Sequence, residues 1–308
     1  MNRATTQTIT NLFELRRDDS FWSLCDSLLP YDRVPPPQLL KWIGNKQKSA
    51  SIIAKIFPKE YGTYFEPFLG SGAILGAMAP QKGIVSDVLR PLIDLWNILQ
   101  VDPEKLYEHY KKNWEKYITD PKKTYTQILA SYNSSPNALD FLFISRTCYG
   151  GVIRFTKAGT MSTPMGPHKP IPPDTFRNRM ILWRNRVKNT KFICASFEKI
   201  MGQANDGDIV YCDPPYIDSQ SILYGAQSFN INNLWEAIKK SKSRGAKVAL
   251  SIDGHKKSGS RVIELDMPSG LFERELFVNN GSSMLRRFQK KDEIMIGEDV
   301  HDRLLLTW

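Results

Sequence analysis

The run from residue 209 to residue 216, Ile-Val-Tyr-Cys-Asp-Pro-Pro-Tyr, constrains this chain more than any other stretch. Its apolar half follows the turn-forming residues Asn-Asp-Gly-Asp at 205–208, a pattern that predicts a buried strand. Pro214 and Pro215 then forbid both a continued strand and an immediate helix, because proline has no main-chain N–H to donate. The sequence therefore predicts a rigid corner at the carboxyl edge of a sheet, with Asp213 at its tip.

This corner presents an unusual set of polar groups. We expect the Asp213 carboxylate and the Pro214 carbonyl to be held as two hydrogen-bond acceptors beside the ring of Tyr216. Two fixed acceptors next to an aromatic ring suit an amino group on a flat heterocycle, because the acceptors take both N–H bonds while the ring stacks on the face. The alternative is a strand that ends at a proline-rich turn and carries no chemistry, and so short a motif does not decide between them.

Composition limits the classes of function. A chain of 308 residues suggests one large or two medium domains. The net charge of +10 favours a polyanionic partner, although a basic surface also serves solubility. The cysteines lack metal-ligand spacing and the few histidines form no HExxH pair, so we expect no metal site. No apolar run approaches the roughly 20 residues of a membrane span, and no secretory signal is found, so we expect a cytoplasmic protein with free thiols and no membrane partner.

A second motif lies upstream at residues 64–75, Tyr-Phe-Glu-Pro-Phe-Leu-Gly-Ser-Gly-Ala-Ile-Leu. It predicts a strand, a turn containing Gly70 and Gly72, and an apolar helix, and the first such turn of a doubly wound sheet is where nucleotides bind. The third glycine of the dinucleotide pattern is absent, so no pyrophosphate need be accommodated. Residues 83–87 predict a second strand ending in Asp87, where such sheets place a carboxylate against ribose hydroxyls. The alternative role of Asp87 is to cap the following helix.

The segment between the two motifs differs from them in its predicted elements and in its content of basic residues. Residues 105–116 and 138–144 predict helices, and residues 146–157 predict a hairpin or loop with a Gly-Gly turn. Residues 177–188 place four arginines and a lysine on a helical pattern. Basic side chains interleaved with aromatic ones, on an insertion, suit a nucleic-acid-reading module, although many of these arginines are equally well explained as a solvated face. We expect an N-terminal extension over 1–37, a catalytic domain over 38–104 and 191–308, and a target-recognition insert over 105–190.

Four motifs in this order resemble one family: Lys-Trp-x-Gly at 41–44, Glu-Pro-Phe-x-Gly-x-Gly at 66–72, Asp-Pro-Pro-Tyr at 213–216 and Leu-Leu-x-Thr at 304–307. From about Pro37 onward the chain resembles the Dam-like DNA adenine-N6 methyltransferases. The resemblance implies an α/β fold: a Rossmann-like sheet that binds S-adenosylmethionine, with an inserted, mainly helical DNA-recognition domain carrying a β-hairpin. It also implies site-specific transfer of a methyl group to N6 of a flipped-out adenine in double-stranded DNA.

The resemblance assigns roles to residues of this chain. The target adenine would be held by Asp213, Pro214, Pro215 and Tyr216. The cofactor would be surrounded by Trp42, Lys46, Phe68, Gly70, Gly72, Asp87, Ser196, Phe197 and Asp213. DNA would be contacted by Tyr149, Arg154, Lys157, Pro164, Tyr224 and Phe229. Among these, Tyr149 matches an aromatic residue that wedges into the base stack, and Arg154 matches an arginine that reads guanine.

Departures from the family pattern lie in the hairpin, where Gly150 replaces a frequent asparagine and residues 161–163 replace a usual Phe-Asn pair. They leave the recognition sequence open.

A cytosine-N4 methyltransferase would use a similar corner but often has serine in place of Asp213. An RNA substrate is disfavoured because the insert resembles a duplex DNA reader, and a DNA-binding module with a degenerate enzyme domain is disfavoured by the intact motifs. The sequence leaves open whether a cognate restriction endonuclease acts on the same site as a partner, in a restriction-modification system, or whether this is an orphan or phage-type methylase, and it leaves the oligomeric state open.

Overall fold

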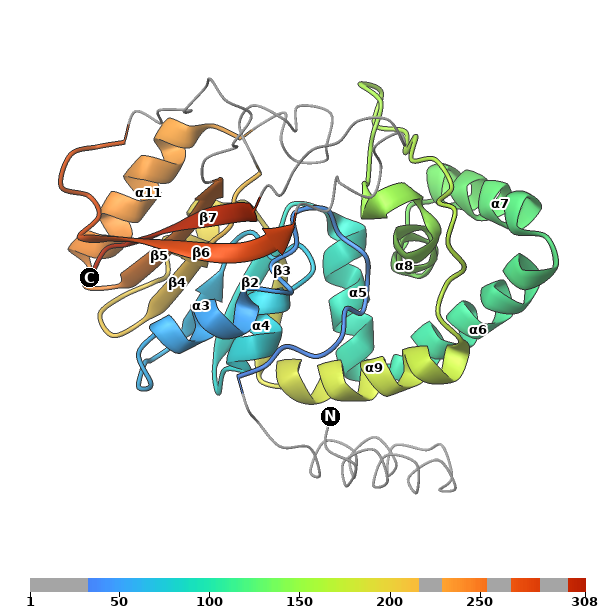
Figure 1. Ribbon diagram of the computed structural model, residues 1–308, viewed down its shortest axis with the longest axis horizontal. Helices are drawn as coiled ribbons and strands as arrows, with labels where there is room; N and C mark the ends of the chain where they lie inside the picture. The colour runs from blue at the N-terminus through green and yellow to red at the C-terminus, as the bar shows by residue number, and fades with distance from the viewer. Residues whose placement is uncertain (1–32, 216–228, 254–266, 283–298) are drawn as a thin grey trace.

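The computed structural model describes residues 33–215, 229–253, 267–282 and 299–308. At the centre of this part of the chain lies a seven-stranded sheet with the order β3-β2-β1-β4-β5-β7-β6 (Figure 1). Its strands are β1 (Tyr64–Glu66), β2 (Gly83–Asp87), β3 (Thr190–Cys194), β4 (Ile209–Cys212), β5 (Lys247–Asp253), β6 (Arg274–Ser282) and β7 (Asp299–Leu306). The predicted strand before the proline corner is thus confirmed as β4, in the middle of the sheet.

The direction of the strands sets where a ligand can bind. Strands β3, β2, β1, β4 and β5 pair in parallel, whereas β7 runs antiparallel to both β5 and β6. The strand order reverses beside β1, whose neighbours are β2 and β4. In open α/β sheets, ligands bind outside the carboxyl ends of the strands at such a reversal. The fold is therefore the expected Rossmann-like sheet with an antiparallel strand.

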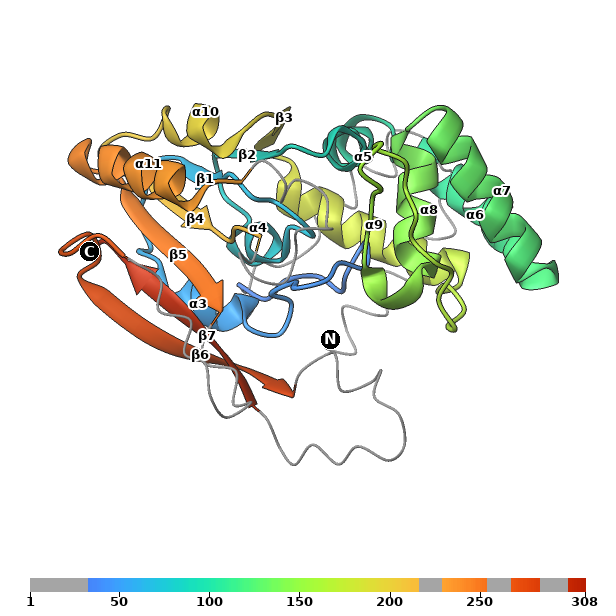
Figure 2. The ribbon, with the colours of Figure 1, turned by 90° about the horizontal axis from the view of Figure 1, so that it is seen from above.

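Two layers of helices bury the two faces of the sheet. Helices α10 (Phe197–Met201) and α11 (Ile231–Ser243) lie along one face, and α3 (Ala50–Ile56) and α4 (Ala73–Met78) lie on the other (Figure 2). Side chains of β4 alternate between the two layers, Ile209 and Tyr211 packing in one core and Val210 and Cys212 in the other. Burial on both faces explains why the sequence of β4 is a continuous apolar run.

The connection between β2 and β3 holds the helical region expected from the sequence. It contains α5 (Arg90–Val101), α6 (Pro103–Thr119), α7 (Pro121–Ser134), α8 (Ala138–Thr147) and α9 (Pro173–Val187). Asp102, Asp120 and Asn137 each accept a main-chain N–H in the first turn of a helix, a contact that fixes where α6, α7 and α8 begin. In Figure 1 these helices stand beside the sheet, although the exact domain boundaries stay a prediction.

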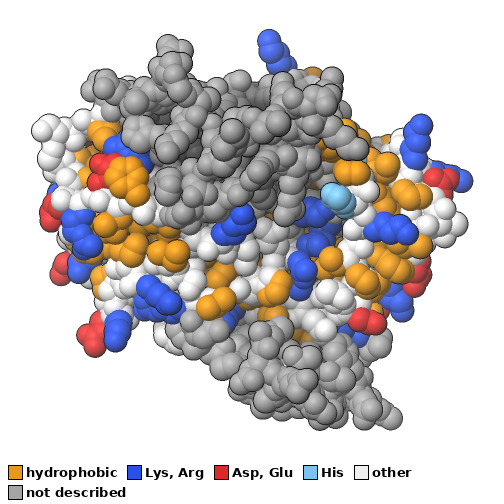
Figure 3. All heavy atoms as spheres, viewed as in Figure 1, with side chains coloured by type: hydrophobic (Ala, Val, Ile, Leu, Met, Phe, Trp, Pro, Cys, Tyr) orange, Lys and Arg blue, Asp and Glu red, His pale blue; other side chains and the backbone are white. Residues whose placement is uncertain are grey.

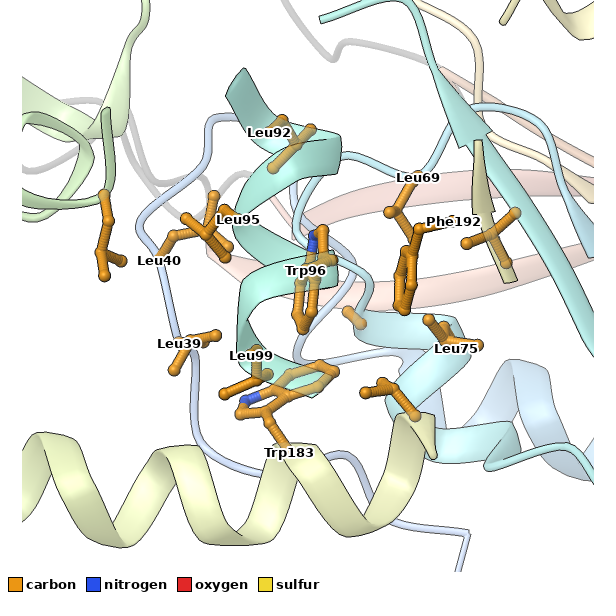
Figure 4. Packing of buried hydrophobic residues seen from close by; sticks show 14 of the residues in the cluster. Leu39, Leu40, Leu69, Leu75, Leu92, Leu95, Trp96, Leu99, Trp183 and Phe192 are labelled. Carbon is orange, nitrogen blue, oxygen red and sulfur yellow. The ribbon is translucent and has the colours of Figure 1, made fainter. Parts of the chain in front are cut away.

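An aromatic cluster joins the helical region to the sheet. Trp96 of α5 stacks on Phe192 of β3 with 5.7 Å between ring centroids, and Trp183 of α9 packs 5.1 Å from Trp96 (Figure 4). The indole N–H of Trp183 donates to the Pro37 carbonyl at 2.9 Å. The cluster therefore fixes α5 and α9 to the sheet and to the chain segment that precedes α3.

The predicted Gly-Gly turn is present, but it is not the turn at which the hairpin reverses. The Gly-Gly pair does not form the turn of the hairpin: Gly150 and Gly151 lie in a short 3₁₀ turn, Tyr149–Gly151, and both have positive φ. The chain reverses instead around residues 156–160, where Thr156 N–H donates to the Thr160 carbonyl and Phe155 is bridged to Met161. The reason is tertiary, because Gly151 packs directly on the main chain of Lys41 and Trp42.

Two kinds of feature are absent from the described residues. None of their helices has the length and apolar character needed to cross a membrane. Within the same residues, no three His, Cys, Asp or Glu side chains are grouped so as to hold a metal ion.

The aromatic cluster generates a stability prediction. Trp183→Ala should reduce the free energy of unfolding by about 3–5 kcal/mol, because it removes a buried indole and leaves a cavity. Denaturant unfolding measures the change, with Val101→Ala at an 81% exposed position of α5 as the control. A loss no larger than that of the control would contradict the proposed role of the cluster.

Candidate functional site

A cavity of about 510 Å³ opens at the carboxyl ends of β1, β2 and β4. It is lined by segments far apart in the sequence, from the loop before α3 to Phe229, two residues before α11. Most of the residues singled out from the sequence come together here: Trp42, Lys46, Phe68, Gly70, Asp87, Ser196, Phe197, Asp213, Pro214, Pro215 and Phe229. The cavity is thus the meeting point of the motifs.

The glycine turn after β1 closes one wall. Gly70 has φ +49°, and a Cβ placed on it would lie 2.9 Å from the indole nitrogen of Trp42. Glycine is therefore required both by the backbone conformation and by the close approach of Trp42. Gly72 lies just behind the cavity wall, where an added Cβ would meet Trp96 at 3.3 Å. Its contact is with the core, so the cofactor contact predicted for Gly72 stays a prediction.

Asp87 is held rigidly at the end of β2. One of its carboxylate oxygens accepts the Gly70 N–H at 3.1 Å, and the other accepts the Leu89 N–H at 3.0 Å. Leu89, not Asp87, is the N-cap residue of α5. The carboxylate ties the glycine turn to β2 and lines the cavity, which is where a group that binds hydroxyls would be needed.

Aromatic side chains form the opposite part of the cavity. Phe68 and Phe197 stack with 5.1 Å between ring centroids, and Phe229 packs edge-on against Phe68 at 5.9 Å. Such faces suit a flat heterocycle. Tyr216 and Tyr224, the other aromatic residues predicted near the target base, lie outside the described residues.

The proline corner carries a buried ion pair. The Lys46 ammonium lies 2.9 Å from one carboxylate oxygen of Asp213, with the lysine side chain 3% exposed and the aspartate 20% exposed. A buried ion pair requires good geometry, because both groups lose hydration. Lys46 therefore fixes the direction of the Asp213 carboxylate, while the exposed part of Asp213 faces the cavity that it lines.

Glu66 is a further carboxyl group in the cavity wall, beside Asp87 and Asp213, and no role was predicted for it. It is buried at the end of β1, and one of its oxygens accepts the Tyr64 hydroxyl at 2.8 Å. Burial raises the pKa of Glu66 to about 8, and the nearby negative charge of Asp213 acts in the same direction. Its position directly before the glycine turn was the available sequence signal, but burial could not be read from that position.

Cys212 lies on the other side of the strand, as expected from its place next to Asp213. Its sulfur is buried 3.9 Å from the sulfur of Met201, and burial raises the pKa of its thiol. A buried thiol with a raised pKa is a poor nucleophile. The chemistry of the cavity is therefore carried by oxygen acceptors and aromatic faces.

Four of the predicted DNA-contacting residues, Tyr149, Arg154, Lys157 and Pro164, lie on the segment that follows α8 and do not line the cavity, whereas Phe229 does. Arg154, Lys157 and Pro164 are exposed, and Tyr149 is half-buried. Two of their neighbours, Gly151 and Ile153, line the cavity itself. Lysine and arginine side chains are spread over the described part of the face seen in Figure 3, including the zone between the sheet and the helices.

The residues of the cavity fit the methyl donor implied by the sequence resemblance. The glycine turn leaves room where a side chain would intrude, Asp87 offers carboxylate oxygens for ribose hydroxyls, and Phe68 and Phe197 offer apolar faces for a base. Nothing in this set calls for a metal ion. The cavity therefore suits a nucleoside.

Comparison with known proteins identifies the family of the chain. A family model described as D12 class N6 adenine-specific DNA methyltransferase matches residues 42–277. A DNA adenine methylase of Vibrio cholerae serotype O1 is 28% identical over 225 residues, which cover 69% of this chain and 79% of the relative. A type II methyltransferase of Lactococcus lactis subsp. cremoris, M1.LlaDCHI, is 28% identical over 240 residues, which cover 73% of this chain and 84% of the relative. Among solved structures, an rRNA methyltransferase of Streptomyces viridochromogenes covers 94% of this chain and 93% of its own, with 13% identity and a TM-score of 0.38.

The buried carboxyl group generates a pH prediction. In the folded chain Glu66 keeps its proton up to about pH 8, whereas in the unfolded chain it releases the proton near its ordinary pKa of 4.5. The stability contributed by the protonated group is therefore fully present below that ordinary pKa and is lost as the pH rises toward about 8. Glu66→Gln has no such proton to release. The melting temperature of this variant, minus that of the wild-type protein, should therefore increase as the pH rises from 4.5 to about 8. Thermal denaturation at several pH values tests this, with Glu108→Gln on the exposed face of α6 as control. A difference independent of pH would contradict the assignment.

Proposed function

The chain belongs to the D12 class N6 adenine-specific DNA methyltransferases, and on that basis we propose that its proline corner holds the amino group of a flipped-out adenine in double-stranded DNA. The family match covers residues 42–277, which include the glycine turn, the ion pair and the corner. The observation that carries the proposal is the position of Asp213: it lines the same cavity as the glycine turn and Asp87, and Lys46 fixes its carboxylate.

The family uses S-adenosylmethionine, which supplies the methyl group on an electrophilic sulfonium. We propose that Asp87 accepts hydrogen bonds from its ribose hydroxyls, that Phe68 and Phe197 cover its base, and that Trp42 and the Gly70 turn close the pocket. The support is that each lines the cavity and that the Gly70–Asp87 hydrogen bond fixes the turn. Ser196 lies at the rim of the same cavity as a further contact.

The chemical problem is that the N6 lone pair of adenine is delocalised into the ring. Hydrogen bonds from both N–H groups to the Asp213 carboxylate and the Pro214 carbonyl would favour a tetrahedral nitrogen with a free lone pair. That lone pair would take the methyl group as the methyl–sulfur bond breaks to leave a neutral thioether, and the surplus proton on N6 would then be lost to water. The contribution of the protein is orientation and electrostatic preorganisation. No nucleophilic Ser or Cys is needed, in agreement with the buried position of Cys212.

An adenine inside a duplex cannot reach the corner, so the base must be flipped out. Flipping costs a few kcal/mol, which stacking on an aromatic side chain offsets in part. Phe229 lies at the cavity, where it can contact the flipped base, and Tyr216 and Tyr224 are proposed to assist it. On the duplex side, we propose that Tyr149 enters the base stack while Arg154, Lys157 and Pro164 contact the groove. The exposure of the last three and the net charge of +10 support this.

The cellular setting is a further proposal. A relative named as a type II methyltransferase supports a role beside a restriction endonuclease that cuts the same DNA site. A cytoplasmic location follows from that role, because both enzymes must reach the same DNA.

The central role of Asp213 is open to a direct test. Asp213→Ala should lower the rate of methyl transfer by at least about 10²- to 10³-fold, because it removes one of the two preorganised acceptors. Binding of duplex DNA should be almost unchanged, since the recognition segment is untouched. Asp206→Ala, in the exposed turn before β4, is the matched control, and thermal denaturation separates lost chemistry from lost fold. Turnover retained in folded Asp213→Ala protein would refute the assignment.

A second test concerns the wall shared by the cavity and the recognition segment. A Cβ added at Gly151 would lie 2.9 Å from the Lys41 Cβ and the Trp42 nitrogen, so Gly151→Ala should displace Trp42. We expect affinity for S-adenosylmethionine to fall about tenfold in isothermal titration, the cost of forcing extra volume into a packed site. Gly159→Ala is the matched control: its φ is also positive, but an added Cβ meets nothing within 4 Å. Equal affinity in both variants would contradict the shared wall.

A further inference from the structure

The exposed segment of residues 152–166, here called the recognition hairpin, has little structure of its own. Its strands are joined by isolated bridges, Phe155 to Met161 within it and Cys148 to Met165 at its base. Few main-chain hydrogen bonds cross it, among them Ser162 N–H to the Arg154 carbonyl at 2.9 Å. Two strands alone are marginally stable in water. The hairpin therefore depends on something else to hold its register.

Helix α7 supplies that support through one side chain, Asn133. The Asn133 carboxamide accepts the Met161 N–H at 2.8 Å and donates to the Met161 carbonyl at 3.0 Å. These are the two bonds that a neighbouring strand would make with a residue of the hairpin. Asn133 thus acts as a one-residue substitute for a third strand, and it holds Met161 at a single position.

A second contact from the same helix lies two residues further along the hairpin. The Tyr125 hydroxyl donates to the Thr163 carbonyl at 2.8 Å, and the Thr163 hydroxyl accepts the Arg154 N–H at 2.9 Å. Helix α7 is therefore linked, through Thr163, to the opposite strand of the hairpin and to Arg154. Both helix contacts are made to main-chain atoms, so they constrain the backbone directly.

The consequence is seen in which side chains face outward. Met161 and Thr163 are buried against the helices, whereas Ser162 and Pro164 are exposed, as is Arg154 on the other strand. In an extended strand, a slip of one residue turns every side chain to the opposite face. If Met161 were released, such a slip of its strand would expose Met161 and Thr163 and bury Ser162 and Pro164. The position of Asn133 decides which side chains the hairpin offers to a duplex.

We propose that Asn133, which lies on α7 and outside the hairpin, is a positioning residue for DNA sequence recognition by this enzyme. It sets the register of the recognition hairpin, and Tyr125 reinforces it. The inference rests on the proposed function, because it takes the hairpin as the part that reads DNA. It predicts that loss of Asn133 lowers sequence discrimination while leaving the cofactor pocket and the fold intact.

The experiment uses the full-length chain, expressed in a host without adenine methylation. Sequencing of host DNA for N6-methyladenine with its flanking bases defines the wild-type motif. Purified Asn133→Ala, Tyr125→Phe and wild-type proteins are then compared on duplexes carrying that motif and on duplexes with one substituted base. Asn137→Ala is the matched control, since Asn137 is also a half-buried asparagine whose carboxamide bonds Asp140 at the start of α8, away from the hairpin.

We expect the ratio of kcat/KM between the motif and the substituted duplexes to fall about tenfold in Asn133→Ala, the scale of losing one base-reading contact. Tyr125→Phe should lower this ratio by a smaller factor than Asn133→Ala does, and Asn137→Ala should leave the ratio unchanged. Affinity for S-adenosylmethionine and melting temperature, measured in parallel, should show no loss in Asn133→Ala beyond that of Asn137→Ala.

The outcomes separate the two levels of inference. If Asn133→Ala and Tyr125→Phe are both active and keep the wild-type motif and the wild-type ratio of kcat/KM, the role of Asn133 is overturned, while the proposed function stands. A fall in discrimination that Asn137→Ala reproduces also overturns it, because the effect would then follow stability. A wild-type chain that leaves no N6-methyladenine and binds no S-adenosylmethionine overturns the proposed function, and this inference with it.

Discussion

The buried ion pair between Lys46 and Asp213 is the contact on which the site depends. The carboxylate stands at the end of a central strand, where two prolines remove the freedom of the chain to move it. Lys46 comes from the loop before α3 and lies 2.9 Å from that carboxylate, so the pair joins the first and last motifs of the cavity. With one oxygen of Asp213 held by the lysine, the group keeps one orientation toward the cavity. That fixed direction is what an acceptor for a reacting amine requires.

The site is not confined to the sheet. The short turn after α8 packs on the main chain of Lys41 and Trp42, and Trp42 in turn lies against the glycine turn that follows β1. The recognition hairpin begins at this same turn and rests on α7 through Asn133 and Tyr125. A continuous set of packed contacts thus runs from helix α7, through the hairpin, to the pocket proposed for the methyl donor. The hairpin, which has little structure of its own, is thus held on one side by α7 and adjoins, at its start, the turn that contacts the pocket.

Much of the fold and the centre of the site could be predicted from the sequence, because both depend on local patterns. The apolar run before Asp213, the glycine turn and the strand ending in Asp87 each carry their own signal, and all three appear where they were expected. The remainder depends on tertiary contacts. Gly150 and Gly151 look like a hairpin turn, yet packing on Lys41 and Trp42 moves the reversal to residues 156–160. The burial of Glu66 could not be read from its place before the glycine turn. Asn133 has no local signature, because its importance comes from a bond to Met161, which is distant in the sequence.

The most direct measurement is a crystal structure of the chain with a duplex containing its motif and a non-reactive analogue of the methyl donor. The account predicts an extruded adenine whose N6 lies about 3 Å from both the Asp213 carboxylate and the Pro214 carbonyl, with Lys46 still paired to Asp213. An extruded base bound elsewhere, or an Asp213 side chain turned into the core, would contradict it.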